Sequence, residues 1–124
     1  MKLLLVSDLH YTLKQFDWID RVAGDFDVVV LAGDHLDIVS TVALEAQIVV
    51  VLKYLQRVGS RATLLVSSGN HDLNARDAAG EKVARWMARA LERCGFRTDE
   101  IAGVGLWPFG LPCPVGVSYQ VVYV

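Results

Sequence analysis

Three short runs of apolar residues stand out in the first half of the chain. They cover residues 2–7, 27–32 and 62–67, and each is bounded by polar or glycine positions. A short run that is apolar throughout, without strict alternation, is typical of a strand covered on both faces. We therefore predict three buried strands at these positions.

Apolar residues at helical spacing separate the second run from the third. The pattern consists of Leu44, Ile48, Val51, Leu52, Leu55 and Val58. Residues three and four apart share one face of a helix, and Gly59 follows where a C-terminal cap belongs. The pattern predicts a helix over about residues 41–58.

Two further helices are expected. After the third run an amphipathic face is formed by Val83, Trp86, Met87, Ala90, Leu91 and Cys94, with Gly95 as a stop signal. A shorter helix is expected near residues 16–23. Strands that alternate with helices predict an α/β fold with a mainly parallel sheet, right-handed crossovers and flanking helices.

Polar residues follow each predicted strand directly. Asp8 and His10 come after the first, Asp34 after the second, and Asn70 with His71 after the third. The carboxyl ends of parallel strands meet at one edge of the sheet, where ligands bind in such folds. The topology alone therefore brings these distant segments together.

The residue types at this edge indicate a metal site. Carboxylate, imidazole and amide ligands without thiolate suit divalent Mn, Fe, Zn or Co. Gly33 and Gly69, which precede Asp34 and Asn70, would let the backbone turn sharply and approach the ions closely. Taken singly, Asp8 and Asp34 are also typical of caps and turns. The ordered combination with the histidines favours metal.

Composition sets the outer bounds. A chain of 124 residues with 53% hydrophobic and 21% charged residues suits one folded domain. A net charge of −2 gives no general attraction for nucleic acid, which is left open as a substrate. No apolar run approaches the roughly 20 residues of a spanning helix. Cys94 and Cys113 form no disulfide framework, which favours the cytoplasm. Oligomerisation is left open.

The motifs D-x-H, G-D-x-x-D and G-N-H-D, in this order, resemble the first three motifs of the calcineurin-like metallophosphoesterase superfamily. The likeness spans about residues 3–72. It implies the N-terminal part of a four-layered α/β sandwich with two facing sheets, of which most of the second sheet is lacking here. It also implies a binuclear centre and hydrolysis of phosphomonoesters or phosphodiesters by a metal-bound hydroxide.

The resemblance also implies a set of metal ligands. By matching position, Asp8 and His10 would bind the first ion and Asp34 would bridge the two ions. Asn70 would bind the second ion.

Four further residues would support the chemistry. His71 would act beside the metals, either by protonating the leaving oxygen or by stabilising developing charge, and Asp37 would hydrogen-bond its ring and orient it. Asp72 is expected behind the ligands or as a cap. His35 lies inside the second motif, but its side chain should point away from the ions.

The chain departs from the family pattern after His71. The family's remaining ligands are three later histidines, whereas all three histidines of this chain are His10, His35 and His71. We therefore expect one tightly held ion, or none. Residues 1–100 would form the N-terminal half of the phosphoesterase domain. Residues 101–124 are uncharged and contain all three prolines. They are either the end of a natural short chain or the result of truncation.

Two functions remain after these steps. The first is a metal-dependent phosphoesterase, impaired in this short chain. The second is an inactive remnant that binds metal or another protein. A nucleotide-binding fold of the Rossmann type is disfavoured, because no G-x-G-x-x-G follows the first strand.

Overall fold

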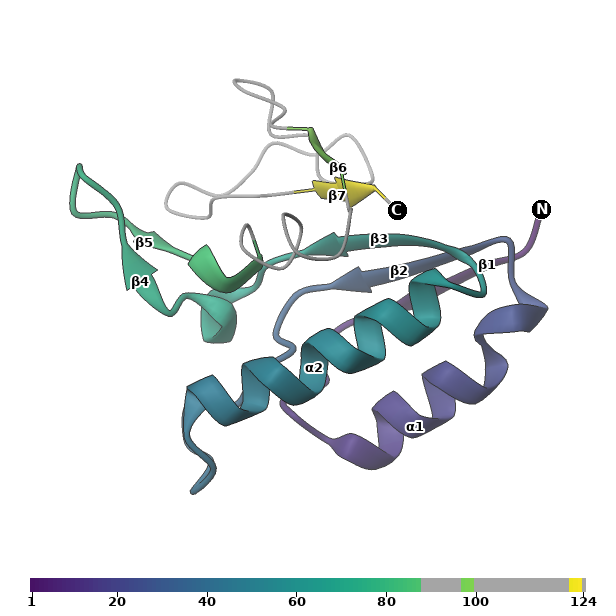
Figure 1. The fold of residues 1–124 in the computed structure, drawn as a ribbon, viewed down its shortest axis with the longest axis horizontal. Helices are drawn as coiled ribbons and strands as arrows, with labels where there is room; N and C mark the ends of the chain where they lie inside the picture. Colours follow the sequence, from purple (N-terminus) through teal and green to yellow (C-terminus); the bar gives the residue numbers. More distant parts are fainter. Residues whose placement is uncertain (88–96, 100–120, 124) are drawn as a thin grey trace.

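The computed structural model describes residues 1–87, together with the backbone of residues 97–99 and 121–123 (Figure 1). The elements in chain order are β1 (Leu3–Val6), α1 (Leu13–Val22), η1 (Ala23–Asp25), β2 (Val28–Ala32), α2 (Leu44–Gly59), β3 (Thr63–Ser67), η2 (Asn70–Asp72), β4 (Ala75–Arg76), β5 (Lys82–Val83), β6 (Arg97–Asp99) and β7 (Val121–Tyr123). The labels η1 and η2 denote single turns of 3₁₀ helix.

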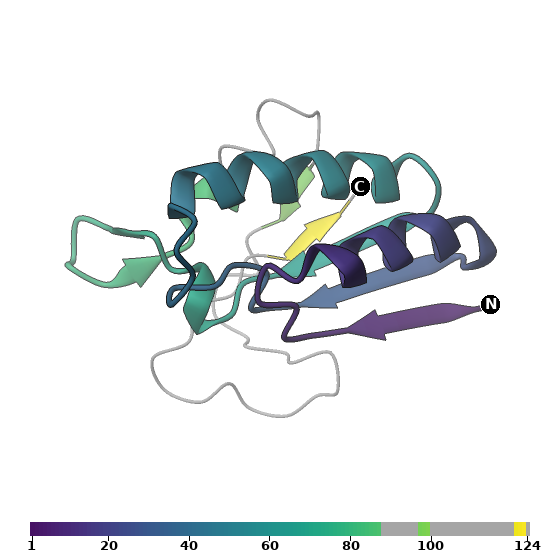
Figure 2. The same ribbon diagram turned by 90° about the horizontal axis from the view of Figure 1, so that it is seen from below.

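The main sheet has the strand order β1-β2-β3-β7-β6. Its first three strands are parallel, with Leu3 opposite Val28 and Val28 opposite Thr63. In Figure 2 the arrows of β1 and β2 point the same way. The predicted α/β fold with a parallel sheet and flanking helices is confirmed. β7 then pairs antiparallel with β3, and β6 with β7, so the complete sheet is mixed.

Helices α1 and α2 lie side by side on one face of the parallel strands (Figures 1 and 2). Alternate residues of β2 and β3 are buried between the sheet and these two helices. The buried set from strands and helices comprises Phe16, Ile19, Val29, Leu31, Val51, Leu55, Val58, Leu64 and Val66. Burying one such side chain stabilises the fold by about 1.5–3 kcal/mol. This core fixes the strands, and with them the positions at which their loops begin.

Helix α2 begins at Leu44, three residues later than the sequence pattern predicts. The preceding Ala43 has an extended backbone with φ −57° and ψ 140°. The buried amide of Gln47 accounts for this. Its Oε1 accepts from the backbone N–H of Asp37 at 2.9 Å, while its Nε2 donates to the carbonyls of Asp37 and Val42 at 3.0 and 2.8 Å. These hydrogen bonds from the Gln47 side chain to Asp37 and Val42 hold the segment before Leu44 in a loop conformation, so the helix begins only at Leu44.

Replacing Gln47 by leucine is expected to lower the free energy of unfolding by about 1–2 kcal/mol, because buried backbone groups of the loop lose their partners. Urea denaturation would measure the change. Gln15→Leu is the matched control, since Gln15 lies exposed on α1. An equal effect of both substitutions would contradict the tethering role of Gln47.

The helix predicted from Val83 onward is partly wrong. Val83 lies in β5 and pairs with Ala75 of β4 in a short antiparallel hairpin. The turn is stabilised by Asp77, whose Oδ1 accepts from the backbone N–H groups of Ala79 and Glu81, both at 2.9 Å. These local hydrogen bonds override the helical spacing of the apolar residues. Helical backbone starts at residue 85, and Cys94 and Gly95 lie outside the described residues.

Most of the uncharged tail lies outside the described residues as well. Only the backbone of 121–123 is described, and it forms β7 within the main sheet. Among the described helices, none has the length and apolar character needed to cross a membrane.

Candidate metal centre

Three loops meet at the carboxyl edge of the parallel strands, as the topology predicts. They cover residues 7–12 after β1, residues 33–43 after β2 and residues 68–74 after β3. Buried leucines anchor the first two loops. Leu9 is 1% exposed and Leu36 is 0% exposed, and both belong to the hydrophobic core. The anchored leucines fix the backbone of both loops, and with it the positions of the polar residues next to them in the sequence.

Backbone hydrogen bonds join the first loop to the second. The N–H of Asp8 donates to the carbonyl of Gly33 at 3.2 Å, and the N–H of His10 donates to the carbonyl of Asp34 at 2.8 Å. The relative position of His10 and Asp34 is therefore set by the backbone rather than by flexible side chains.

All four non-glycine residues with positive φ in the described chain lie in these two loops. They are Asp8, His10, Tyr11 and Asp34, with φ between 42° and 56°. Left-handed backbone is unfavourable for residues with a Cβ atom, and such strain tends to cluster at functional sites. The surrounding hydrogen bonds hold the strained residues in place, which marks this edge as a candidate site.

The second and third loops touch through two glycines. Gly33 has φ +91°, and a Cβ atom there would lie 2.9 Å from the backbone nitrogen of Gly69. A Cβ atom on Gly69 would lie 2.5 Å from the backbone nitrogen of Asp34 and closer still to its carboxylate. The sequence suggested that these glycines allow the backbone to approach a metal ion. The structure shows that they allow the two backbones to approach each other.

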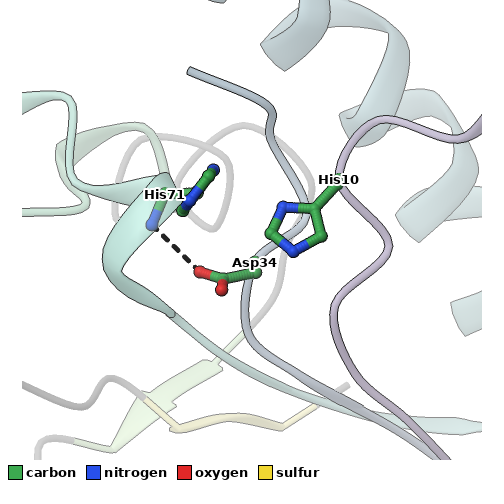
Figure 3. Close-up of side chains that lie close together, drawn as sticks. All are labelled: His10, Asp34 and His71. Atoms are coloured by element: carbon green, nitrogen blue, oxygen red, sulfur yellow. Dashed lines mark hydrogen bonds between the residues drawn. The ribbon is translucent and has the colours of Figure 1, made fainter. Parts of the chain in front are cut away.

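Side chains from all three loops come together at the centre of this edge. Ligand atoms of His10, Asp34 and His71 lie within 4.8 Å of one another (Figure 3). The two imidazole rings meet edge to face, with centroids 4.6 Å apart. The Asp34 carboxylate lies between them, and its Oδ1 accepts from the backbone N–H of His71 at 2.9 Å.

These three residues fit a divalent ion. Atoms bound to one ion at about 2.0–2.2 Å can be at most about 4.4 Å apart, so a small side-chain shift would bring all three into its shell. Two imidazoles and a carboxylate suit Mn, Fe, Zn or Co. His71 also carries an Nδ1 atom that is buried without a hydrogen-bond partner among the described residues.

Two residues expected as ligands lie beside this group. The carboxylate of Asp8 is 3.8 Å from the Nε2 of His10, and its side chain is 65% exposed. Asn70 begins η2 and is exposed. Asp8 lies two residues before His10 and Asn70 directly precedes His71, but neither belongs to the group formed by His10, Asp34 and His71.

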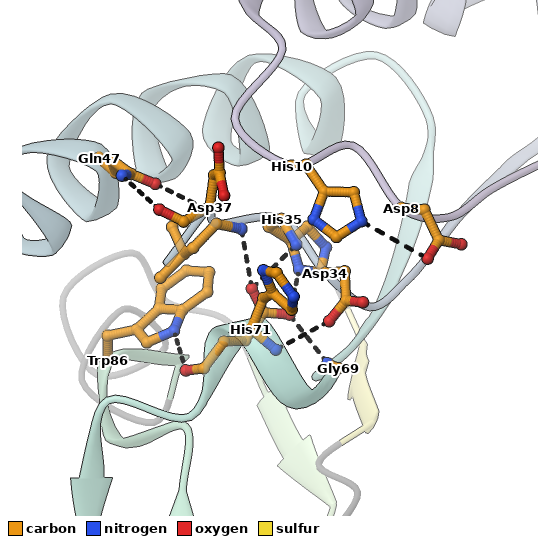
Figure 4. A network of polar contacts seen from close by, with 11 residues as sticks. Asp8, His10, Asp34, His35, Asp37, Gln47, Gly69, His71 and Trp86 are labelled. Carbon is orange, nitrogen blue, oxygen red and sulfur yellow. Dashed lines mark hydrogen bonds and ion pairs between the residues drawn. The ribbon is translucent and has the colours of Figure 1, made fainter. Parts of the chain in front are cut away.

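Asp37 is not placed against the ring of His71. The Oδ1 of Asp37 accepts from the backbone N–H of Val39 at 3.0 Å, within its own loop. The hydrogen bond expected from the sequence between Asp37 and the His71 ring is absent from the described contacts. Asp37 instead shapes the loop that Gln47 holds (Figure 4).

Asp72 and His35, the chain neighbours of His71 and Asp34, form a buried pair, and Figure 4 shows His35 among the side chains of this edge. Both side chains are 0% exposed, and the Nδ1 of His35 lies 2.9 Å from the Oδ2 of Asp72. Oδ2 also accepts from the N–H of Gly69 at 2.9 Å. Oδ1 accepts from the N–H groups of His35 and Leu36 at 2.9 and 3.0 Å. One carboxylate thus binds the second and third loops together.

The pKa of Asp72 reflects this environment. Burial by itself would raise the pKa of the carboxyl group, but the hydrogen bond and electrostatic attraction of His35, with the N–H groups of Gly69 and Leu36, lower it below the ordinary value of 3.8. Asp72 is therefore ionised and can only accept, so the Nδ1 of His35 carries the proton that the pair shares.

Trp86 contacts both members of the buried pair formed by Asp72 and His35. Its Nε1 donates to the carbonyl of Asp72 at 2.9 Å, and its ring meets that of His35 with centroids 6.0 Å apart. The sequence pattern placed Trp86 on the apolar face of a predicted helix and gave no sign of either contact. It also missed the role of Gln47, although a polar residue within the apolar stripe of α2 was a usable signal.

Comparison with known proteins gives one match. A family model described as calcineurin-like phosphoesterase matches residues 1–111, which include all three loops. Searches of curated proteins and of solved structures gave no match.

Proposed function

Because the chain belongs to the calcineurin-like phosphoesterase family, we propose that it is a metal-dependent phosphoesterase that hydrolyses phosphomonoesters or phosphodiesters. One observation carries the proposal. His10, Asp34 and His71 come from three loops more than 20 residues apart in sequence and yet place their ligand atoms within 4.8 Å of one another. A group of this kind at the carboxyl edge of a parallel sheet is suited to bind an ion and a substrate together.

The ion would be Mn, Fe, Zn or Co. His10 and Asp34 would hold it, and Asp8 and Asn70 are proposed as additional oxygen ligands, since both are exposed and lie close in the chain to members of this group. When bound, the ion supplies positive charge that polarises a phosphoryl oxygen and makes a water molecule more acidic.

The residues of the chain supply the positioning. The N–H of His71 holds one oxygen of the Asp34 carboxylate, so the carboxylate has one fixed orientation. Asp72 locks the second and third loops from behind through its backbone contacts. A site that is already assembled before substrate arrives loses little free energy to reorganisation during the reaction.

Turnover of nitrophenyl phosphate mono- and diesters tests the proposal. We expect turnover with added Mn and none after chelation with EDTA. Asp34→Asn is expected to lower kcat/KM at least about tenfold, because the amide keeps an oxygen ligand but loses the charge that holds the ion. Asp25→Asn is the matched control, since Asp25 is exposed in η1 at the opposite end of the sheet.

Unchanged activity in Asp34→Asn would contradict the metal mechanism.

A specific observation supports a second candidate function, that of an inactive metal-binding protein. Residues 1–124 contain three histidines, all within the first three motifs, so the later histidine ligands of the family have no counterpart within these residues. Metal-dependent stabilisation without turnover of either ester would favour this second candidate.

A further inference from the structure

Exposed apolar side chains gather beside the loops at the carboxyl edge. Four of the nine large apolar side chains that are exposed in the described part of the chain lie in these loops or directly after them. They are Leu13, Ile38, Val39 and Val42, which we call the apolar rim. Val39 is 83% exposed and Ile38 is 54% exposed. Single exposed apolar residues are ordinary on a protein surface, but three within five residues of one loop form a small apolar surface.

Polar side chains hold the loop that carries three of these residues. The Oδ1 of Asp37 accepts from the N–H of Val39 at 3.0 Å, and the Oγ of Ser40 accepts from the N–H of Val42 at 3.1 Å. The buried amide of Gln47 donates to the carbonyl of Val42 at 2.8 Å. The loop is therefore held in one conformation while its apolar side chains face water. A loop that is ordered in advance loses little conformational entropy when a ligand binds to it.

The apolar rim is within reach of the candidate metal centre. Ile38 follows Asp34 by four residues, so their backbones lie at most about 14 Å apart. Leu13 follows His10 by three residues, which limits that separation to about 11 Å. Figure 4 shows Asp37, the residue before Ile38, in the same close-up as His10 and Asp34. A ligand with a charged group at the centre can therefore extend its remaining part over the rim.

The loop part of the rim carries no charge. Residues 38–44 contain no charged side chain. A second phosphate group or a polyanionic chain would find no opposite charge there. An uncharged apolar group would instead cover exposed apolar side chains and remove them from water, which is favourable. The chemistry of this surface therefore favours a ligand whose part beyond the centre is apolar.

We propose that the apolar rim binds the alcohol part of a phosphate ester, so that the preferred ligands are phosphate esters of apolar alcohols rather than nucleotides or other polar esters. The inference rests on the proposed function, since it names the substrate class of the same centre. The centre would hold the phosphate group, and the rim would add affinity through the apolar group. Ile38 and Val39, the most exposed members of the rim, determine this specificity.

Alkylphosphonates test the inference without reference to turnover, because an esterase does not cleave their carbon–phosphorus bond. Isothermal titration calorimetry in the presence of Mn compares methylphosphonate with hexylphosphonate. We expect the hexyl ligand to bind at least about tenfold more tightly, because its methylene groups leave water on the rim. The double variant Ile38→Thr with Val39→Thr should reduce this ratio to below about threefold, since its side chains stay branched but become more polar. Leu3→Thr is the matched control and should keep the wild-type ratio, because Leu3 is 51% exposed but begins β1, at the opposite edge of the sheet.

The possible outcomes separate the inference from the proposed function. Circular dichroism shows whether each variant is folded, and Val39→Thr alone is measured beside the double variant. Equal affinity of the wild type for both phosphonates, or an unchanged ratio in the folded double variant, overturns the inference. Hexanol bound as tightly as hexylphosphonate also overturns it, because the rim would then bind apolar ligands without the centre.

Turnover of the nitrophenyl esters is measured on the same samples. If the esters are hydrolysed but chain length does not affect phosphonate affinity, the proposed function stands and the inference fails. If the expected affinity ratios are found but neither ester is hydrolysed, the inference stands as a binding preference and the proposed function fails.

Discussion

Replacing Asp72 by asparagine is expected to lower the free energy of unfolding by about 3 kcal/mol, a large part of the stability of a domain of this size. The Asp72 carboxylate accepts from three backbone N–H groups and from the His35 ring. An amide keeps one acceptor oxygen and puts an NH₂ group in place of the other. That group would face N–H donors, and buried donors would lose their partner.

Urea denaturation followed by circular dichroism measures this loss. Asp25→Asn is the control, because Asp25 is exposed and its substitution should change stability by less than about 0.5 kcal/mol. If Asp72→Asn also changed the free energy of unfolding by less than about 0.5 kcal/mol, the pair of Asp72 and His35 would contribute little to stability.

The pH dependence of the free energy of unfolding provides a second test of the role of the Asp72 carboxylate. The pKa of Asp72 is lower in the folded chain than its ordinary value, so the ionised form is favoured by folding. Its contribution is fully present above the unfolded pKa of about 3.9 and is lost as the pH falls through the folded value. The stability difference between wild type and Asp72→Asn should therefore narrow as the pH falls below about 4. A constant difference down to the acid transition would contradict this assignment.

Replacing Gly69 by alanine is expected to disable the proposed metal centre. The new Cβ atom would lie 2.5 Å from the backbone nitrogen of Asp34 and would overlap the carboxylate that joins the three-residue group. Because the obstacle is backbone and a hydrogen-bonded side chain, the loops must separate. We expect metal affinity to fall at least about 100-fold and the free energy of unfolding to fall by about 2–3 kcal/mol.

Gly24→Ala provides the matched control for this substitution. A Cβ atom at Gly24 meets nothing within 4 Å, and its backbone has no positive φ. That change should leave both metal affinity and stability close to those of the wild type, or raise stability slightly. Equal behaviour of the two alanine variants in calorimetry and urea denaturation would show that the contact between the second and third loops is not required.

The three parallel strands of this fold could be predicted from the sequence with little error, whereas the β4–β5 hairpin was not predicted. A continuous apolar run that ends in a polar cluster indicates a buried parallel strand, and β2 and β3 begin within one residue of the predicted positions. The start of α2 could not be predicted in the same way. It depends on hydrogen bonds from Gln47 to Asp37, ten residues earlier, and no local spacing reveals such a contact.

The location of the candidate site was also predictable, whereas its internal contacts were not. Parallel topology brings Asp8, Asp34 and Asn70 to one edge without knowledge of any side-chain rotamer. The pairing of His35 with Asp72 depends on which way a side chain leaves its loop, and the sequence indicated only that His35 points away from the ions. The left-handed backbone at Asp8 and Asp34 was equally hidden, because aspartate carries no signal comparable to that of glycine.

The hydrogen bonds of Asp72 also bear on how the chain folds. They join residues 36 and 37 positions apart in sequence, with α2 and β3 between them. Contacts of such separation form only after the entropy of closing a long loop has been overcome, and they slow folding. The centre can therefore assemble only late, once the parallel strands have paired. A divalent ion that binds only this assembled state would slow unfolding of the chain, while leaving the early steps of folding unchanged.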